Sequence, residues 1–173
     1  DQIPQRLLDA GTFQGRPFGR FDSLDPTDGG ATHRTSVSGT WHRASGQGMT
    51  RVSWYALRYG FQLYSNFTYN LDRAQDQFGQ SDQRTVLGGK IDRSWLSDLG
   101  DGRIAQHTWG LSLRQDQIRV GLEDTLARQT QATVRLDDVR QTSLGLYAES
   151  DIRWAPWWRT VAGFTIGFAL WFP

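Results

Sequence analysis

The chain has 173 residues, a formal net charge of +1 and 21% charged residues. This length suits one ordinary domain, and the balanced charge gives no electrostatic reason to expect a nucleic acid as partner. Cysteine is absent, which excludes disulfides, thiol catalysis and cysteine-based metal sites. No apolar run reaches the roughly 18 residues of a transmembrane helix, and the opening DQIPQRLLDAG lacks the basic and apolar regions of a signal peptide.

The predicted elements begin with a loop and continue as strands. Residues 1–30 are rich in Pro, Gly and Asp and show no hydrophobic period, which is typical of a loop segment. After them, apolar and polar residues alternate, which is the period of a strand. The alternation predicts strands at residues 32–43, 50–71, 84–96, 104–116, 142–154 and 158–172. We therefore expect an all-β fold, an antiparallel up-and-down meander of about six long strands, with residues 31–173 forming one β-barrel segment.

The second predicted strand is the longest and the most aromatic. In YALRYGFQLYSNFTYNL, residues 55–71, the odd positions are large and apolar except for Ser65. Ordinary strands have about five or six residues, so this length predicts a strand that crosses a bilayer and continues beyond it. We expect its aromatic face to contact lipid and Arg58, Gln62 and Asn66 to point into a wet lumen. Further inward candidates, each with a solvated surface of no specific role as the alternative, are Lys90, Asp92, Arg114, Glu149, Asp151 and Arg153.

The connections between the predicted strands alternate in length. Short turns are expected at residues 44–48, 97–102 and 155–156. Long polar connections are expected at residues 72–83 and at about 117–141. Short turns at one end and long loops at the other are typical of an arc of a transmembrane outer-membrane β-barrel. About eight strands are the minimum for closing such a barrel, so six strands predict an arc of something larger.

The tryptophans support the same architecture. Mean hydropathy is −0.56, yet the chain has eight Trp, nine Phe and five Tyr. An amphipathic indole prefers the headgroup level, so a row of Trp at one end of a sheet indicates an interfacial belt. A soluble β-sandwich with Trp capping one end of its core is the alternative. The residues that flank the three short turns are Trp41, Trp54, Trp95, Trp109, Trp154, Trp157 and Trp158.

Several stretches follow one another in order between residues 2 and 163: QIPQRLLDAG, RFDSLDPTDGG, YALRYGFQLYSNFTYNL, DQFGQSDQRTVLGG, VGLEDTLARQ, TSLGLYAESDIRW and APWWRTVAG. Together they resemble the barrel of TonB-dependent outer-membrane receptors, the siderophore-receptor type especially. The resemblance implies a barrel of about 22 strands in the bacterial outer membrane, filled by an N-terminal plug and importing a ligand with energy from TonB. Neither a plug domain nor a TonB box is recognisable in these residues, and the final TIGFALWFP departs from the pattern.

The remaining motifs have ordinary structural interpretations. The sequon at Asn66 lies within a predicted strand, and Gly88 and Gly89 before Lys90 are better explained as strand glycines that give room to a neighbour. The three histidines show no ligand spacing. Asp22, Asp25 and Asp28 in SLDPTDGG could bind Ca²⁺, although Asx and Pro turns are the favoured alternative. No hydrolase motif is present, so we expect no enzyme, no catalytic, cofactor-binding or metal residues, and no cofactor.

Two functions of different classes follow. The first is a segment of a TonB-dependent outer-membrane transporter for a ferric siderophore or similarly scarce ligand, with lipid, the ligand, a plug domain and TonB as partners of the intact protein. Its extracellular loops would meet the ligand through Phe13, Phe18, Phe21, Phe78, Arg16 and Arg20. The alternative is a small independent outer-membrane or secreted β-protein, a structural or binding module that completes itself by oligomerising.

Overall fold

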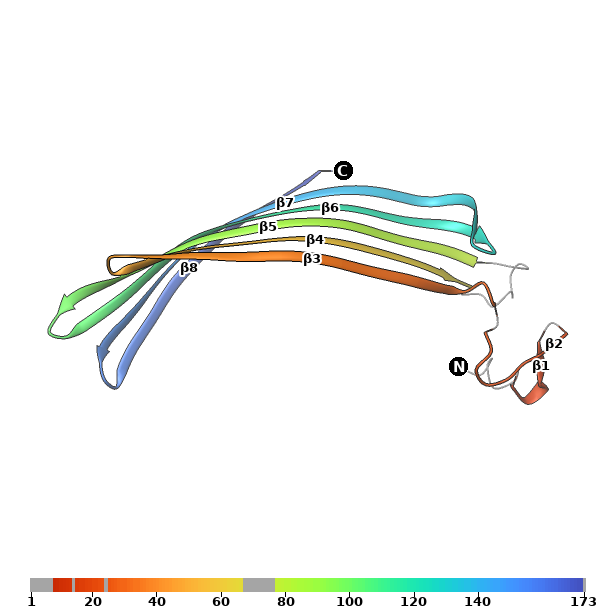
Figure 1. Ribbon diagram of the computed structural model, residues 1–173, viewed down its shortest axis with the longest axis horizontal. Helices are drawn as coiled ribbons and strands as arrows, with labels where there is room; N and C mark the ends of the chain where they lie inside the picture. The colour runs from red at the N-terminus through yellow and green to blue at the C-terminus, as the bar shows by residue number, and fades with distance from the viewer. Residues whose placement is uncertain (1–7, 14, 24, 67–76, 173) are drawn as a thin grey trace. The chain divides into compact units, whose positions relative to one another are not determined.

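Six strands form one sheet in the order of the sequence. The computed structural model describes residues 8–13, 15–23, 25–66 and 77–172. The sheet order is β3-β4-β5-β6-β7-β8, an antiparallel meander, and a separate two-stranded sheet pairs β1 with β2 (Figure 1). The strands are β1 Thr12–Phe13, β2 Arg16–Pro17, β3 Gly29–Ser45, β4 Gly48–Ser65, β5 Gln77–Gly100, β6 Arg103–Leu126, β7 Gln129–Ala155 and β8 Trp158–Phe172. The predicted all-β meander of six long strands is confirmed.

The strand bounds agree best where the apolar alternation is cleanest. The predicted strand 158–172 coincides with β8, and the first predicted strand lies within β3. The second continues only to Ser65 in β4, and its predicted end at 67–71 falls outside the described residues. Residues 77–83, predicted as part of a long connection, are instead the beginning of β5.

The prediction of a long loop at about 117–141 is wrong. These residues continue β6 and begin β7, and the two strands meet in a tight turn at Ala127 and Arg128, with φ of 49° and 67°. Two successive residues with positive φ are the geometry of a type I′ hairpin turn, which fits the twist of the flanking strands. Across the same hairpin, Arg119 Nη2 lies 3.0 Å from Asp138 Oδ2.

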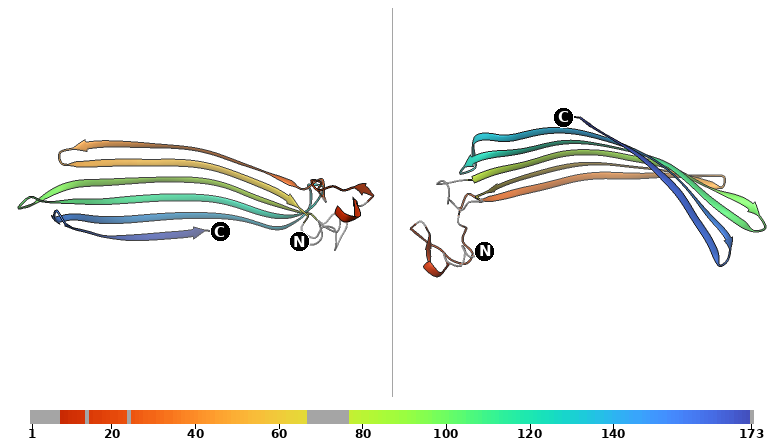
Figure 2. Two further views of the ribbon diagram at one scale, coloured as in Figure 1. Left: turned by 90° about the horizontal axis from the view of Figure 1, so that it is seen from below. Right: turned by 180° about the vertical axis from the view of Figure 1, so that it is seen from behind.

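Tight turns join β3 to β4, β5 to β6 and β7 to β8 (Figure 2). Gly46 in the β3–β4 turn and Gly102 in the β5–β6 turn have φ of 58° and 73°, values that glycine adopts without steric cost. The seven tryptophans predicted to flank these turns do so. The β7–β8 turn follows a register shift between Arg153 and Ala155, beyond which Leu146 pairs with Ile166 and Ala148 with Phe164.

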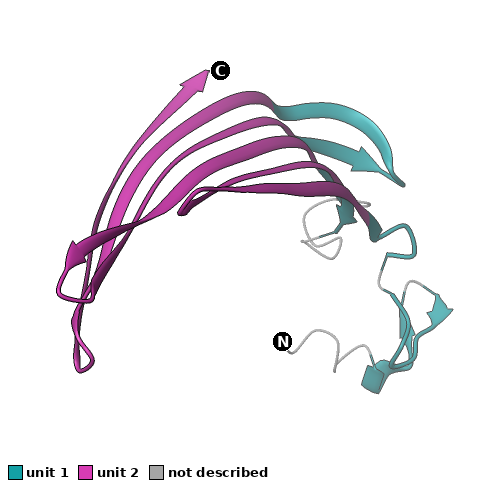
Figure 3. Cartoon of the chain, turned by 60° about the vertical axis from the view of Figure 1, so that its left-hand side comes forward, with its two compact units in different colours: residues 1–31, 61–81, 121–136 teal, residues 32–60, 82–120, 137–173 magenta. Residues whose placement is uncertain are grey.

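Unit 2 comprises residues 32–60, 82–120 and 137–173 (Figure 3). Over the strand segments of this unit, the side chains form one apolar and one polar face. A Cβ added at Gly39 would meet Trp54, and Trp95 lies 5.3 Å from His107, so these side chains share the apolar face. Alternation places on the same face Val37, Trp41, Leu87, Ile91, Trp109, Leu111, Leu113, Leu144, Leu146, Phe164, Ile166, Phe168 and Leu170, most of them exposed. The opposite, polar face carries Thr40 with Ser53 and Lys90 with Tyr147.

Little of this sheet is a buried core. Among the described residues, only Val86 and Ala105 are buried apolar residues, at 5% and 0% exposure. The apolar side chains therefore lie on a surface rather than in an interior, and a surface of this kind marks a contact with a membrane or a partner. No helix in the described part of the chain is long and apolar enough to cross a membrane.

Candidate functional site

The polar face carries three cations, each with a carboxylate two residues along its own strand. Residues two apart on a strand share a face, so each pair forms within one strand. Lys90 Nζ lies 3.3 Å from Asp92 Oδ1, and Arg114 Nε lies 2.7 Å from Asp116 Oδ2. The third pair is Arg84 with Asp82, at 2.6 Å. Such half-exposed pairs stabilise a fold by only about 0–1 kcal/mol each.

In each of these pairs, the cationic side chain is more exposed to solvent than its carboxylate partner. The cation side chains are 46%, 48% and 54% exposed, whereas their carboxylates are 19%, 16% and 7% exposed. An anion approaching the polar face therefore meets guanidinium and ammonium groups first. The predicted inward residues Lys90, Asp92 and Arg114 belong to this set, and Asp151 of the same face pairs with Arg159.

Tyrosines of other strands complete the three sites, and two of them reach across an intervening strand. The Lys90 ammonium lies 4.7 Å from the centre of the Tyr147 ring, a cation–π contact. Tyr55 is within hydrogen-bonding reach of Arg114, and Tyr59 interacts electrostatically with Arg84. Each cation thus has a carboxylate from its own strand and a tyrosine from another strand in its surroundings.

Two glycines make room for these tyrosines. A Cβ at Gly88 would lie 2.3 Å from Tyr55 Cζ, and one at Gly110 would lie 2.2 Å from Tyr147 Cε1. Each ring therefore lies across the bare backbone of the next strand. This confirms the interpretation of Gly88 as a strand glycine that accommodates a neighbour.

The prediction for the two faces of β4 was wrong. Tyr55 and Tyr59 were expected to contact lipid, but they share the polar face with Arg114 and Arg84. Arg58, expected in the lumen, alternates with them and lies on the same face as Trp54, as does Gln62. The physical reason is that a tyrosine ring has both an apolar body and a polar hydroxyl, so an aromatic line suits either side of a sheet.

A second group of polar residues, here called the loop-anchoring cluster, comprises Asp25, Thr27, Asp28, Asn66, Gln77, Thr125 and Arg128. All belong to unit 1, which comprises residues 1–31, 61–81 and 121–136. They come from the segment before β3, the residue after β4, the start of β5, the end of β6 and the β6–β7 turn. The cluster therefore connects segments that are far apart in the sequence.

Gln77 is the centre of this cluster and is 0% exposed. Its Nε2 donates to Thr27 Oγ1 at 2.9 Å and to Asp28 Oδ1 at 3.1 Å. Its Oε1 accepts from Thr125 Oγ1 at 3.1 Å and from the Arg128 amide at 2.9 Å. Both donors and both acceptor positions of the side-chain amide are therefore satisfied.

Arg128 fixes the β6–β7 turn to the segment before β3. Its Nε donates to the Thr27 carbonyl at 2.7 Å, and its Nη2 donates to the Asp28 carbonyl at 3.2 Å. Its guanidinium also lies 5.6 Å from the centre of the Tyr64 ring. These contacts offset the cost of a positive φ at a residue with a side chain.

Asp25 and Asp28 are used as hydrogen-bond acceptors within the cluster. Asp25 Oδ1 accepts from the Thr27 amide and hydroxyl at 2.8 and 2.6 Å, and Asp28 Oδ1 accepts from the Asn66 amide at 3.0 Å. The bond from the Thr27 amide to Asp25 is an Asx-type turn, the interpretation favoured over a Ca²⁺ site, whereas the bond to Asp28 is a long-range contact. In the part of the chain that is described, no three His, Cys, Asp or Glu residues lie together in a way that could hold a metal ion.

The anchoring of this loop is expected to depend on pH through Asp25. Burial alone would raise the pKa of Asp25, but hydrogen bonds from Thr27 and Asn66 and the charge of Arg16 outweigh it and hold the pKa below its ordinary value. A carboxyl whose pKa is lower in the folded than in the unfolded protein stabilises the folded loop at pH values above its unfolded pKa, and this contribution is lost as the pH falls through the folded pKa. Hydrogen exchange of the Thr27 amide, corrected for its intrinsic rate, should therefore show protection that is constant down to about pH 4 and then falls.

The matched variant for this measurement is Asp25→Asn, which has no carboxyl to titrate and should show no such step. Protection that is the same in both proteins throughout the acid range would contradict the role of Asp25.

The histidines and the loop aromatics lie in separate places. His33 covers Gly60, and His107 Nδ1 lies 2.7 Å from Ser150 Oγ. Phe13 and Phe18 pack edge to face at 6.0 Å, and Phe21 is 97% exposed. Phe78, predicted in a loop, is part of β5 instead.

Sequence reasoning missed Gln77, Thr125 and Arg128, whose partners are 48 to 101 residues away.

Together, these features define the class of structure: an antiparallel arc of a β-barrel with an apolar and a polar face. A solved structure of the ferric citrate transporter FecA in its unliganded form is similar to this chain, with a TM-score of 0.67 and 14% sequence identity. The similarity covers 87% of this chain and 23% of that chain, and at this identity it establishes the fold. No protein-family model and no curated protein sequence matches the chain.

Proposed function

We propose that this chain forms part of the wall of a TonB-dependent outer-membrane importer. The observation that carries the proposal is the division of one meander into an apolar face of exposed large side chains and a polar face of charged pairs. In a transmembrane β-barrel the apolar face meets lipid and the polar face lines the lumen. The tryptophans beside the tight turns would then form the belt at the periplasmic interface. The resemblance of the ordered sequence stretches to TonB-dependent receptors supports the same proposal.

The substrate would be an anionic ferric siderophore or a similarly scarce anionic ligand. The polar face presents its cations more openly than its carboxylates, which favours an anion in the lumen. The segment before β3 also exposes Phe21 and Arg20. An exposed ring beside a guanidinium suits a ligand with both aromatic and anionic groups. The proposed activity is transport rather than catalysis.

The importer proposal predicts a native protein larger than this chain. β3 and β8 each pair on one side only within the described residues, and an open edge cannot remain in lipid. Antibody to residues 117–141 should detect, in an outer-membrane fraction, a band several times larger than 19.7 kDa that shifts on boiling. A band at the mass of this chain would instead favour the small β-protein that closes by association, because both unpaired edges would then need another copy.

Ligand contact by the segment before β3 is tested separately. Replacing Arg20 and Phe21 together by alanine should reduce uptake of the ferric chelate roughly tenfold, which corresponds to about 1.4 kcal/mol of lost binding. The matched control is Arg43→Ala, an exposed arginine of β3 near the tight turns, which should leave uptake unchanged. Normal uptake by the double variant would remove this segment from the ligand site.

A further inference from the structure

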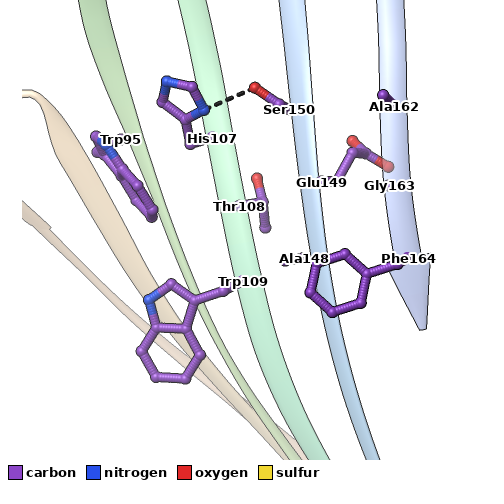
Figure 4. A pocket seen from close by; sticks show the side chains of 10 residues that line it. All are labelled: Trp95, His107, Thr108, Trp109, Ala148, Glu149, Ser150, Ala162, Gly163 and Phe164. Atoms are coloured by element: carbon purple, nitrogen blue, oxygen red, sulfur yellow. Dashed lines mark hydrogen bonds between the residues drawn. The ribbon is translucent and has the colours of Figure 1, made fainter. Parts of the chain in front are cut away.

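The apolar face of unit 2 is hollowed between β5 and β8. The hollow has a volume of about 450 Å³ and is shown in Figure 4. Its walls are aromatic, formed by Trp95, Trp109 and Phe164, whereas Ala148 and Ala162 form its floor. The hollow exists because small residues of β7 and β8 lie between large residues on the same face. Its volume falls in the range of roughly 300–1,000 Å³ that is usual for small-molecule sites.

One hydrogen-bonded polar pair lies within this slot, whose polar lining also includes Thr108 and Glu149. Ser150 Oγ and His107 Nδ1 are 2.7 Å apart, and the His107 ring lies 5.3 Å from Trp95 at an interplanar angle of 37°. A hydroxyl and an imidazole together keep further hydrogen-bonding capacity after they have bonded to each other. The slot therefore combines an apolar groove with polar groups, and its chemistry fits a ligand with a long apolar body and oxygen atoms near one end.

We propose that this slot binds a single phospholipid. One acyl chain would lie over Ala148 and Ala162 between the aromatic walls, and the ester or headgroup oxygens would meet His107 and Ser150. The inference rests on the proposed function, which places the apolar face against lipid and the tight turns in the periplasmic leaflet. Trp95 and Trp109 mark the headgroup level in that arrangement, so the polar pair lies at the depth of the lipid's glycerol backbone.

The test uses the intact protein, extracted from membranes and stripped of loosely held lipid by detergent exchange. Native mass spectrometry should find one retained phospholipid on the unmodified protein. Ala162→Phe fills the slot with a ring and should lower the retained fraction at least about tenfold. His107→Phe keeps a ring against Trp95 but removes the polar contact, and should weaken retention several-fold. The matched control is Ala56→Phe, an alanine on the apolar face of β4 that does not line the slot.

Three outcomes would overturn the proposal: no retained phospholipid on the unmodified protein, equal retention by Ala162→Phe, or equal loss in the Ala56→Phe control. A second measurement separates the slot from the proposed function. Phospholipid brominated on its acyl chains should quench tryptophan fluorescence when the protein is reconstituted in bilayers. An absence of quenching would mean that the apolar face does not meet lipid, and both proposals would fail. If tryptophan fluorescence is quenched in the unmodified protein and in all variants, but all of them retain phospholipid equally, the proposed lipid slot would be rejected and the proposed function would stand.

Discussion

Replacing Gln77 by alanine is expected to release the segment before β3 from the β6–β7 turn. The substitution removes four side-chain hydrogen bonds at a position with 0% exposure. A buried group that loses its partner costs about 1–3 kcal/mol, and the Arg128 amide would lose its acceptor, whereas the Thr125 hydroxyl keeps the Gln77 carbonyl. We therefore expect a local loss of about 1–3 kcal/mol.

Hydrogen exchange of the Thr27 and Arg128 amides should report this loss as faster exchange of both, although they are far apart in the sequence. Gln83→Ala is the matched control, because Gln83 is an exposed glutamine of the same strand and its replacement should change neither amide. Gln77→Glu should also speed exchange at Thr27, since a carboxylate cannot donate to Thr27 Oγ1 or Asp28 Oδ1, but it can still accept from the Arg128 amide. Exchange in Gln77→Ala equal to that in the control would show that the cluster does not hold the loop.

The loop-anchoring cluster also bears on the proposed transport. The segment that exposes Arg20 and Phe21 continues directly into Asp25–Asp28, which Gln77 and Arg128 hold. A ligand site on an anchored segment binds more tightly than one on a free segment, because less conformational entropy is lost on binding. Gln77→Ala is thus expected to weaken ligand binding without changing the boiled or unboiled size of the intact protein.

The sequence predicted the meander but not the full length of its strands. Alternation identified all six strands, and in β8 it also gave both ends. It failed between residues 117 and 141, where β6 and β7 continue without a consistent apolar face. Their turn, Leu126-Ala127-Arg128-Gln129, lacks the Asn-Gly or Asp-Gly pair that usually marks a type I′ hairpin. Here the positive φ values are supported by distant contacts of Arg128, which a local pattern does not contain.

The candidate site was predictable only in part, for a related reason. Alternation shows which side chains of one strand share a face, so Lys90 with Asp92 was found from the sequence. It does not show how the faces of neighbouring strands match, and this is where the assignment of Tyr55 and Arg58 was reversed. The decisive information is the contact between Tyr55 and the bare backbone of Gly88 on the next strand.

The contact between Tyr55 and Gly88 leads to the second large expected effect, a difference in stability between the Gly88→Ala and Gly89→Ala variants. Gly88→Ala would place a Cβ 2.3 Å from the Tyr55 ring, whereas a Cβ at Gly89 would find its nearest neighbour at 3.6 Å. The first substitution must displace the ring from Arg114, and overpacking of this kind costs about 1–3 kcal/mol. The second should be neutral or slightly stabilising, since alanine loses less backbone entropy than glycine on folding. Denaturant midpoints of the intact protein in detergent would measure both.

A double-mutant cycle with Tyr55→Ala identifies the cause. If the ring is what the new methyl group displaces, Gly88→Ala should cost little once the ring is gone, so the two substitutions should be strongly non-additive. Additive effects would mean that Gly88 is required by its own backbone, and the proposed fit of tyrosine over glycine would be wrong. Because Tyr55 also contacts Arg114, Gly88→Ala should alter transport of an anionic ligand even where the protein remains folded, whereas Gly89→Ala should not. Stability and transport together therefore test whether the tyrosines of the polar face serve the fold alone or also position its cations.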